Sequence, residues 1–376
     1  MKKKTWRTDM TPRKTTLFLC VCCCLILFFL SGCDSKEEKN VRKALETELN
    51  QLKDSDSEMA RQYMQTEDMA LVFQNEDGLS EDIAYIFQLF YKDFSYKIGK
   101  ISITENKAVV HTKLKIMNSQ KLAKDFARLS LEKNIEQEAS PSEVQTSAAD
   151  SYTLLRELLE SKDYKTQSVS ADISLKKKGG TWKVIHTAKL DETLTGNFFS
   201  YVTSSNLLSP SEIVETHFHT MKEFDSEQLK HYLSLDTLTD TEDSEKNTLI
   251  QAVTEQIHQS FDFKIKKETI DGTSAVVQTA ITSVDFEQIL QTYQEELSKW
   301  LKTSAALAGG SEGRRQKEYE LLLSCMEQNK AVVSHDVEIP LVNDGVNWKI
   351  QMTPEVSQAV FGDVQNALNT VSESKN

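Results

Sequence analysis

Two stretches of the chain are near copies of one another. Residues Phe94–Leu114 read FSYKIGKISITENKAVVHTKL, and residues Phe261–Ile281 read FDFKIKKETIDGTSAVVQTAI. They align without a gap at an offset of 167, and nine of the 21 positions are identical. In both stretches Ile, Val and Thr alternate with polar residues on either side of a short turn. This pattern predicts a β-hairpin with one buried face in each half of the chain.

A second pair of blocks follows in the same order. Residues 173–184 match residues 339–350 at an offset of 166, including Trp182 with Trp348 and Gly179 with Gly345. Because the order of matching blocks is the same in both halves, we infer one domain that was duplicated, and not a solenoid of short repeats.

The repeat and the flanking sequence divide the chain. Ser209-Pro210-Ser211-Glu212 opens the second copy as a capping box with proline at the first helical position. The linker is short and holds Leu207 and Leu208, so we expect the copies to pack together. The expected segments are a signal peptide 1–32, a tether 33–40, a first copy 41–203, a linker 204–210, a second copy 211–368 and a tail 369–376.

Each copy is expected to start with helices and to end with a hairpin. Apolar residues at helical spacing predict the first helices (Leu45, Leu49 and Leu52; Ile213, Val214, Phe218 and Met221), and Ser55 and Ser80 are expected to start two more. The strands are expected at 100–104, 107–117, 172–178 and 182–188, with 336–342 and 348–352 closing the second copy.

A helical excursion separates the hairpins of each copy. The stripe from Phe286 to Leu301 predicts one such helix, whereas the polar segments 136–150 and 303–318 are expected to be mobile loops. The sequence thus predicts a helix-rich α+β protein with two tandem copies of a helix-first, antiparallel-sheet unit.

The N-terminus has the pattern of an export signal. Six basic residues precede an apolar run, Leu17–Leu30, which is shorter than the roughly 20 residues of a membrane span. The sequence Leu30-Ser31-Gly32-Cys33 resembles the lipobox of bacterial lipoproteins. That resemblance implies cleavage between Gly32 and Cys33, a diacylglyceryl group on the Cys33 sulfur, and a lipid-anchored protein on the extracytoplasmic face of the cell membrane. An uncleaved signal anchor is the alternative, and Met10 is an alternative start.

Cysteine usage and charge agree with export. Of six cysteines, only Cys33 and Cys325 remain after removal of 1–32. Because Cys33 is the lipid site, Cys325 has no partner left for an intramolecular disulfide in the mature chain.

Removal of the signal peptide also makes the chain more acidic. Six basic residues and one acidic residue are removed from a chain of net charge −13, which leaves −18. This charge argues against nucleic acid as a partner and predicts repulsion from an anionic membrane, although solubility alone explains it more simply.

The closing hairpins carry a second resemblance. Gly179-Gly180-Thr181-Trp182-Lys183-Val184 and Asp344-Gly345-Val346-Asn347-Trp348-Lys349-Ile350, which follow helices and antiparallel strands, resemble the nuclear-transport-factor-2-like (cystatin-like) family. They look most like its lipoprotein relatives of unknown function in Gram-positive bacteria. The resemblance implies an α+β cone, from which each copy departs by its long excursion. Family members include isomerases, dehydratases and binding modules, so the fold does not settle the function.

No catalytic, cofactor or metal constellation emerges from the sequence. His217 and His219 are two apart on a predicted helix, so they point in different directions and are expected to face solvent. His111 has Gln278 as its counterpart, and Cys325 lies in an apolar run typical of a core cysteine. Gly309-Gly310 lacks a phosphate-loop lysine, and Asp344-Gly345 lacks the further acids of a calcium loop. Trp182 and Trp348 are expected to cover the cores.

These observations favour a non-enzymatic, membrane-anchored module that binds an envelope protein, peptide or component through its concave faces or the seam between the copies. Its expected partners are the lipid bilayer, through Cys33, and such an envelope component. The alternatives are a transporter's solute-binding lipoprotein, which requires doubly wound lobes, and an isomerase or dehydratase.

The anchor predicts the behaviour of a single substitution. Cys33→Ala is expected to abolish lipidation and the processing that depends on it, because the thiol is the acylated atom. Metabolic labelling with a fatty acid measures this directly. Label retained on the Cys33→Ala protein would contradict the assignment.

Overall fold

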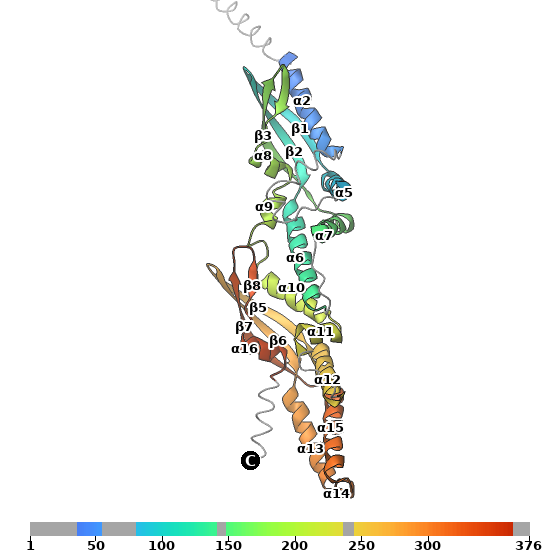
Figure 1. Cartoon of the computed structure of the whole chain (residues 1–376). Coiled ribbons are helices and arrows are strands. Elements are labelled where there is room, and N and C mark those ends of the chain that lie inside the picture. Colours follow the sequence, from blue (N-terminus) through green and yellow to red (C-terminus); the bar gives the residue numbers. More distant parts are fainter. Residues whose placement is uncertain (1–35, 55–79, 141–147, 236–243, 364–376) are drawn as a thin grey trace, which may run out of the picture.

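The computed structural model describes residues 36–54, 80–140, 148–235 and 244–363. Figure 1 shows two sheet-and-helix units placed end to end along one long axis. Each holds a four-stranded antiparallel sheet with its strands in sequential order. The strands are β1 (Ser95–Thr104), β2 (Lys107–Met117), β3 (Thr166–Lys178) and β4 (Thr181–Val184) in the first unit, and β5 (Asp262–Asp271), β6 (Ser274–Val284), β7 (Val332–Asn343) and β8 (Trp348–Ile350) in the second. The predicted helix-rich α+β class is confirmed.

The helices precede, interrupt and follow each sheet. In the first unit they are α2 (Lys36–Lys53), α5 (Ser80–Tyr91), α6 (Ser119–Glu138), α7 (Ala148–Ser161), α8 (Ala188–Leu194) and α9 (Phe198–Val202). In the second unit they are α10 (Pro210–Lys222), α11 (Ser226–Tyr232), α12 (Ser244–Ser260), α13 (Phe286–Leu301), α14 (Ser304–Ala308), α15 (Gly310–Gln328) and α16 (Pro354–Val360).

The first helix of each unit packs on its sheet through the predicted apolar stripe. Val41, Leu45, Leu49 and Leu52 of α2 are all buried. The helix begins at Lys36, so residues 36–40, which we expected in the tether, are helical. Acidic residues in the first turn favour this start, because they face the positive end of the helix dipole. The helix predicted from Ser55 lies outside the described residues.

The strands alternate as predicted, and three are longer: β1 begins at Ser95, five residues before the predicted start at 100. Every second side chain of β2 is buried, from Ala108 to Ile116. β3 begins at Thr166 and β7 at Val332, several residues before the predicted starts, because each pairs with the full length of its neighbour. The return strands are shorter than predicted and end at Val184 and Ile350.

The prediction of a loop at 303–318 is wrong, because this segment is almost entirely helical. The Thr303 hydroxyl accepts a hydrogen bond from the Ala306 amide and caps α14, and α15 runs on from Gly310. Gly310 has a φ of +61°, which glycine adopts without strain, and so allows the tight turn between the two helices. The polar residues after this turn include Glu, Arg, Gln and Lys, which are good helix formers.

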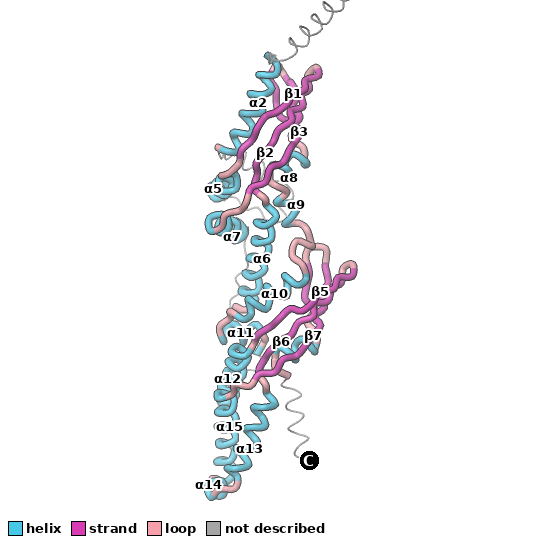
Figure 2. The backbone as a smooth tube through the Cα atoms, turned by 180° about the vertical axis from the view of Figure 1, so that it is seen from behind, coloured by secondary structure: helices cyan, strands magenta, loops and turns pink. Residues whose placement is uncertain are grey.

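Helix α6 belongs to both units (Figure 2). Leu122 and Phe126 lie in the core of the first unit, whereas Ile135 lies in the core of the second unit. The adjacent linker residues divide in the same way, with Leu207 in the first core and Leu208 in the second. The expectation that the two copies pack together is therefore confirmed.

Polar contacts reinforce this seam. Ser209 and Glu212 form the predicted capping box of α10, with the Ser209 amide donating to Glu212 Oε2 at 2.9 Å. Lys124 of α6 donates to both carboxylate oxygens of the same Glu212 at 3.0 Å, and Arg128 lies 3.5 Å from it. The Ser209 amide, Lys124 and Arg128 together hold the pKa of Glu212 below its usual value against the opposing effect of burial.

Candidate functional site

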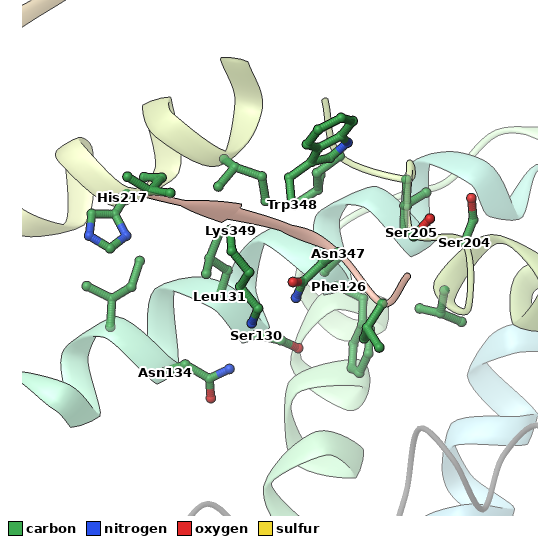
Figure 3. A pocket seen from close by; sticks show the side chains of 18 of the residues that line it. Phe126, Ser130, Leu131, Asn134, Ser204, Ser205, His217, Asn347, Trp348 and Lys349 are labelled. Carbon is green, nitrogen blue, oxygen red and sulfur yellow. The ribbon is translucent and has the colours of Figure 1, made fainter. Parts of the chain in front are cut away.

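A pocket lies between the two units (Figure 3). Its volume is about 480 Å³, within the range of small-molecule sites. The walls come from α6, from Val202 at the end of α9, from residues 204–208 of the linker, from α10 and from β8 with the turn before it. Apolar lining residues include Phe126, Leu131, Ile135, Leu208, Ile213 and Ile350. Polar lining residues include Ser130, Asn134, Ser205, His217, Asn347 and Lys349.

Asn347 lines this pocket and carries a hydrogen-bond acceptor without a partner in the described part of the chain. Its Oδ1 atom is buried and has no hydrogen-bond partner among the described residues. Figure 3 shows the Asn347 side chain on the same side of the strand as Lys349, and Ser130 of α6 lines the same pocket. A buried acceptor without a partner costs about 1–3 kcal/mol, so a ligand donor recovers that energy when the Asn347 side chain turns its Oδ1 towards the pocket.

The turn before β8 fixes the position of Asn347. Asp344 Oδ1 accepts hydrogen bonds from the backbone amides of Val346 and Asn347, both at 2.9 Å. These two bonds lower the pKa of Asp344. The Asp344 carboxylate therefore organises the turn.

His217 is a correction to the sequence-based expectation. It lines the pocket and is hydrogen-bonded to the Tyr232 hydroxyl, whereas we expected it to face solvent. Burial lowers its pKa to about 4, so the imidazole is neutral at pH 7. His219 is exposed, and its ring packs edge-on against the Phe263 ring with 5.0 Å between the ring centroids. The two histidines thus point in different directions, as their spacing predicts.

The first unit has a pocket at the equivalent place, where no helix among the described residues takes the position of α6. A pocket of about 740 Å³ lies between α2 and β4, and Trp182, Lys183 and Val184 occupy the positions of Trp348, Lys349 and Ile350. The matching groove of the second unit is closed on one side by α6, so the duplication has produced one open and one covered version of one surface.

His186 is the charged centre of the open groove. Its Nε2 lies 2.9 Å from Glu48 Oε1, and its Nδ1 lies 3.0 Å from Asp191 Oδ1. The hydrogen bond with Glu48, supported by that with Asp191, raises the pKa of His186 to about 9. Sequence reasoning missed this residue, because its two carboxylate partners lie on α2 and α8.

Both predicted core tryptophans are buried, and each also makes a polar contact. Trp182 Nε1 donates to Glu37 Oε2 at 2.9 Å, and Trp348 Nε1 donates to Asn206 Oδ1 at 3.2 Å. Glu37 and Asn206 occupy equivalent places in the two copies. The hydrogen bond between each tryptophan and the start of its unit is therefore repeated as well.

The other residues considered in the sequence lie apart from the pocket. His111 pairs across the sheet with Asp172 at 2.8 Å in an exposed position, and Gln278 pairs with Glu338 at the matching place. Cys325 is half-buried against the second core, and burial raises its pKa. Gly309 joins α14 to α15.

The lipobox, including Gly32 and Cys33, lies outside the described residues. Within the part of the chain that the structure describes, no helix is long and apolar enough to cross a membrane. In the same part, no group of three or more His, Cys, Asp or Glu side chains is arranged to hold a metal ion.

Comparison with known proteins gives little to transfer to this chain. No family model matches it, and no curated protein matches it significantly. One solved structure is similar over 71% of this chain and 95% of its own, with 11% sequence identity and a TM-score of 0.25. It is described as a "putative lipoprotein (ycdA)" from Bacillus subtilis. A likeness of this size supports no transfer of fold or function, so the resemblance to the nuclear-transport-factor-2-like family stays a prediction.

The His186 cluster predicts a pH dependence of stability. In the unfolded chain the His186 imidazolium loses its proton near pH 6.5, whereas in the folded protein it keeps the proton up to about pH 9. Because the folded-state pKa is raised, the stabilisation is complete below about pH 6.5 and is lost as the pH rises towards 9. Between pH 6.5 and 9.5, the wild type should lose on the order of 2 kcal/mol of unfolding free energy relative to His186→Gln.

Urea unfolding of both proteins across this range measures the difference. His217→Gln serves as a control, since the pKa of His217 is lowered and its titration falls well below this range. Parallel pH profiles for the wild type and His186→Gln would contradict the assigned ion pairs.

Proposed function

We propose that the protein is a lipid-anchored, extracytoplasmic binding module whose ligand occupies the pocket between its two units. The anchor is the diacylglyceryl group that the lipobox implies at Cys33. The observation that carries the binding role is the buried, unpartnered Oδ1 atom of Asn347 in a pocket of about 480 Å³.

The lining supports a polar, hydrogen-bonding ligand with an apolar portion. Asn347 offers an acceptor, and Ser130, Asn134 and Lys349 offer donors on the facing wall and the strand. Leu131, on the same α6 face, and other apolar side chains line the rest of the pocket. A short peptide segment or a small amide-containing envelope component has this combination of groups.

The geometry favours binding over acid–base catalysis. The ionisable lining residues are Glu138, His217 and Lys349, and in the described part no hydrogen bond joins any two of them. General acid–base chemistry uses positioned groups with pKa values near the working pH, and the pKa of His217 is about 4. A transporter's solute-binding protein would need doubly wound lobes, whereas every described strand pair is antiparallel.

Asn347→Leu tests the binding role against a purely structural one. It removes the unpartnered acceptor and keeps the number and branching of the side-chain heavy atoms, so thermal unfolding should show equal or greater stability. The same change should weaken ligand capture at least fivefold, because a ligand donor loses its acceptor. A photoreactive benzoylphenylalanine in place of Asn134, in the anchored protein in cells, captures whatever occupies the pocket.

The matched control places the same photoreactive residue at Lys133, which neighbours Asn134 on α6 and does not line the pocket. We expect an adduct from position 134 only, with its yield reduced by Asn347→Leu. Equal adducts from both positions, or a yield indifferent to Asn347→Leu, would contradict the proposed site.

A further inference from the structure

One end of the first unit is rich in lysine. The start of α2, the β1–β2 turn and the β3–β4 turn meet at this end, which is opposite to α14 along the long axis (Figure 1). We call this surface the basic tip. Its lysines are Lys36, Lys39, Lys107, Lys176, Lys177 and Lys178. Three glutamates, Glu37, Glu38 and Glu105, lie in the same segments, so positive charge is in excess.

Two of these lysines face each other across the sheet. Lys107 and Lys176 are direct partners in the register of β2 and β3, and both are exposed. Side chains in such a pair have Cβ atoms about 4.5–5.5 Å apart, and like charges there are destabilising. Within the described residues neither has an ion-pair partner, whereas Lys177 is paired with Glu37 at 2.9 Å. The pair therefore favours an external anion.

The second unit shows that the fold does not require this charge. At the same register position Ser274 faces Val342, and Asn343 and Asp344 stand where the first unit has Lys177 and Lys178. The basic tip is a property of the first unit alone, the unit that follows the anchor.

The tether holds this end of the molecule close to the bilayer. Lys36 is the third residue after Cys33, and at most about 3.6 Å per residue keeps the start of α2 within roughly 11 Å of the anchored residue. Electrostatic attraction in physiological salt reaches about 8 Å. A lipidated chain thus keeps the start of α2, which is part of the tip, within about 1.4 screening lengths of the anchored residue.

We propose that the basic tip is a membrane-contact surface that binds the anionic headgroups of the bilayer in which Cys33 is anchored. The contact would orient the long axis away from the bilayer, so that the pocket between the units is held off the membrane. The net acidic charge of the rest of the chain favours the same orientation, because it is repelled by the anionic surface. This inference rests on the proposed anchor.

Vesicle sedimentation of the mature, unacylated chain tests the tip separately from the anchor. The chain 33–376 with Cys33→Ser is mixed at low salt with vesicles of phosphatidylcholine, with or without one-third phosphatidylglycerol. The test variant is Lys107→Ser/Lys176→Ser/Lys178→Ser. The control, Lys264→Ser/Lys267→Ser/Lys302→Ser, removes the same charge from exposed lysines of the second unit. Circular dichroism checks that all the proteins are folded.

We expect at least tenfold tighter binding to the anionic vesicles, loss of at least tenfold in the tip variant, and less than twofold change in the control. Equal binding to both vesicles, or an equal loss in the control, would overturn the proposal. Tighter binding of soluble polyphosphate than of anionic vesicles, at equal phosphate concentration, would assign the tip to an anionic polymer and also overturn it. Failure of the anchor would appear instead as a lack of fatty-acid label on Cys33.

Discussion

The arrangement of the two units depends on one helix that is buried at two places. The first part of α6 lies in the core of the first unit through Leu122 and Phe126, and its later part enters the second core through Ile135. Ala127 packs against both cores. Since these contacts would be lost together if the units separated, the seam holds them as one body. The Glu212 carboxylate, which caps α10 and pairs with Lys124, fixes the register of that contact.

Duplication has given two versions of each surface, and the differences between them suggest a division of roles. The groove beside Trp348 is covered by α6 and becomes a pocket, whereas the groove beside Trp182 stays open and contains the His186 cluster. The tip of the first unit is basic, and that of the second is not. Proximity to the membrane would thus fall to one end of the molecule, and ligand binding to the seam between the units.

The sequence predicts features that depend on neighbouring residues, and it misses burial that depends on elements distant in the sequence. Strand alternation in β2, the capping box at Ser209 and the burial of the tryptophans follow from neighbouring residues, and all are present. The burial of His217 could not be predicted, because α6, which faces it across the pocket, belongs to the other copy. The first part of α15, residues 310–318, was expected to be a loop because Gly309-Gly310 and the polar residues after it resemble one, although they permit a tight helical turn.

The rigid seam is the central claim, and a distance distribution tests it most directly. Spin labels at the equivalent exposed positions Ser102 and Thr269, in the mature chain with Cys33→Ser and Cys325→Ser, report the separation of the two sheets by pulsed electron resonance. A rigid seam predicts one narrow distribution, which Ile135→Asp broadens by placing a charge in the second core. A broad distribution in the parent protein, unchanged by Ile135→Asp, would contradict the account.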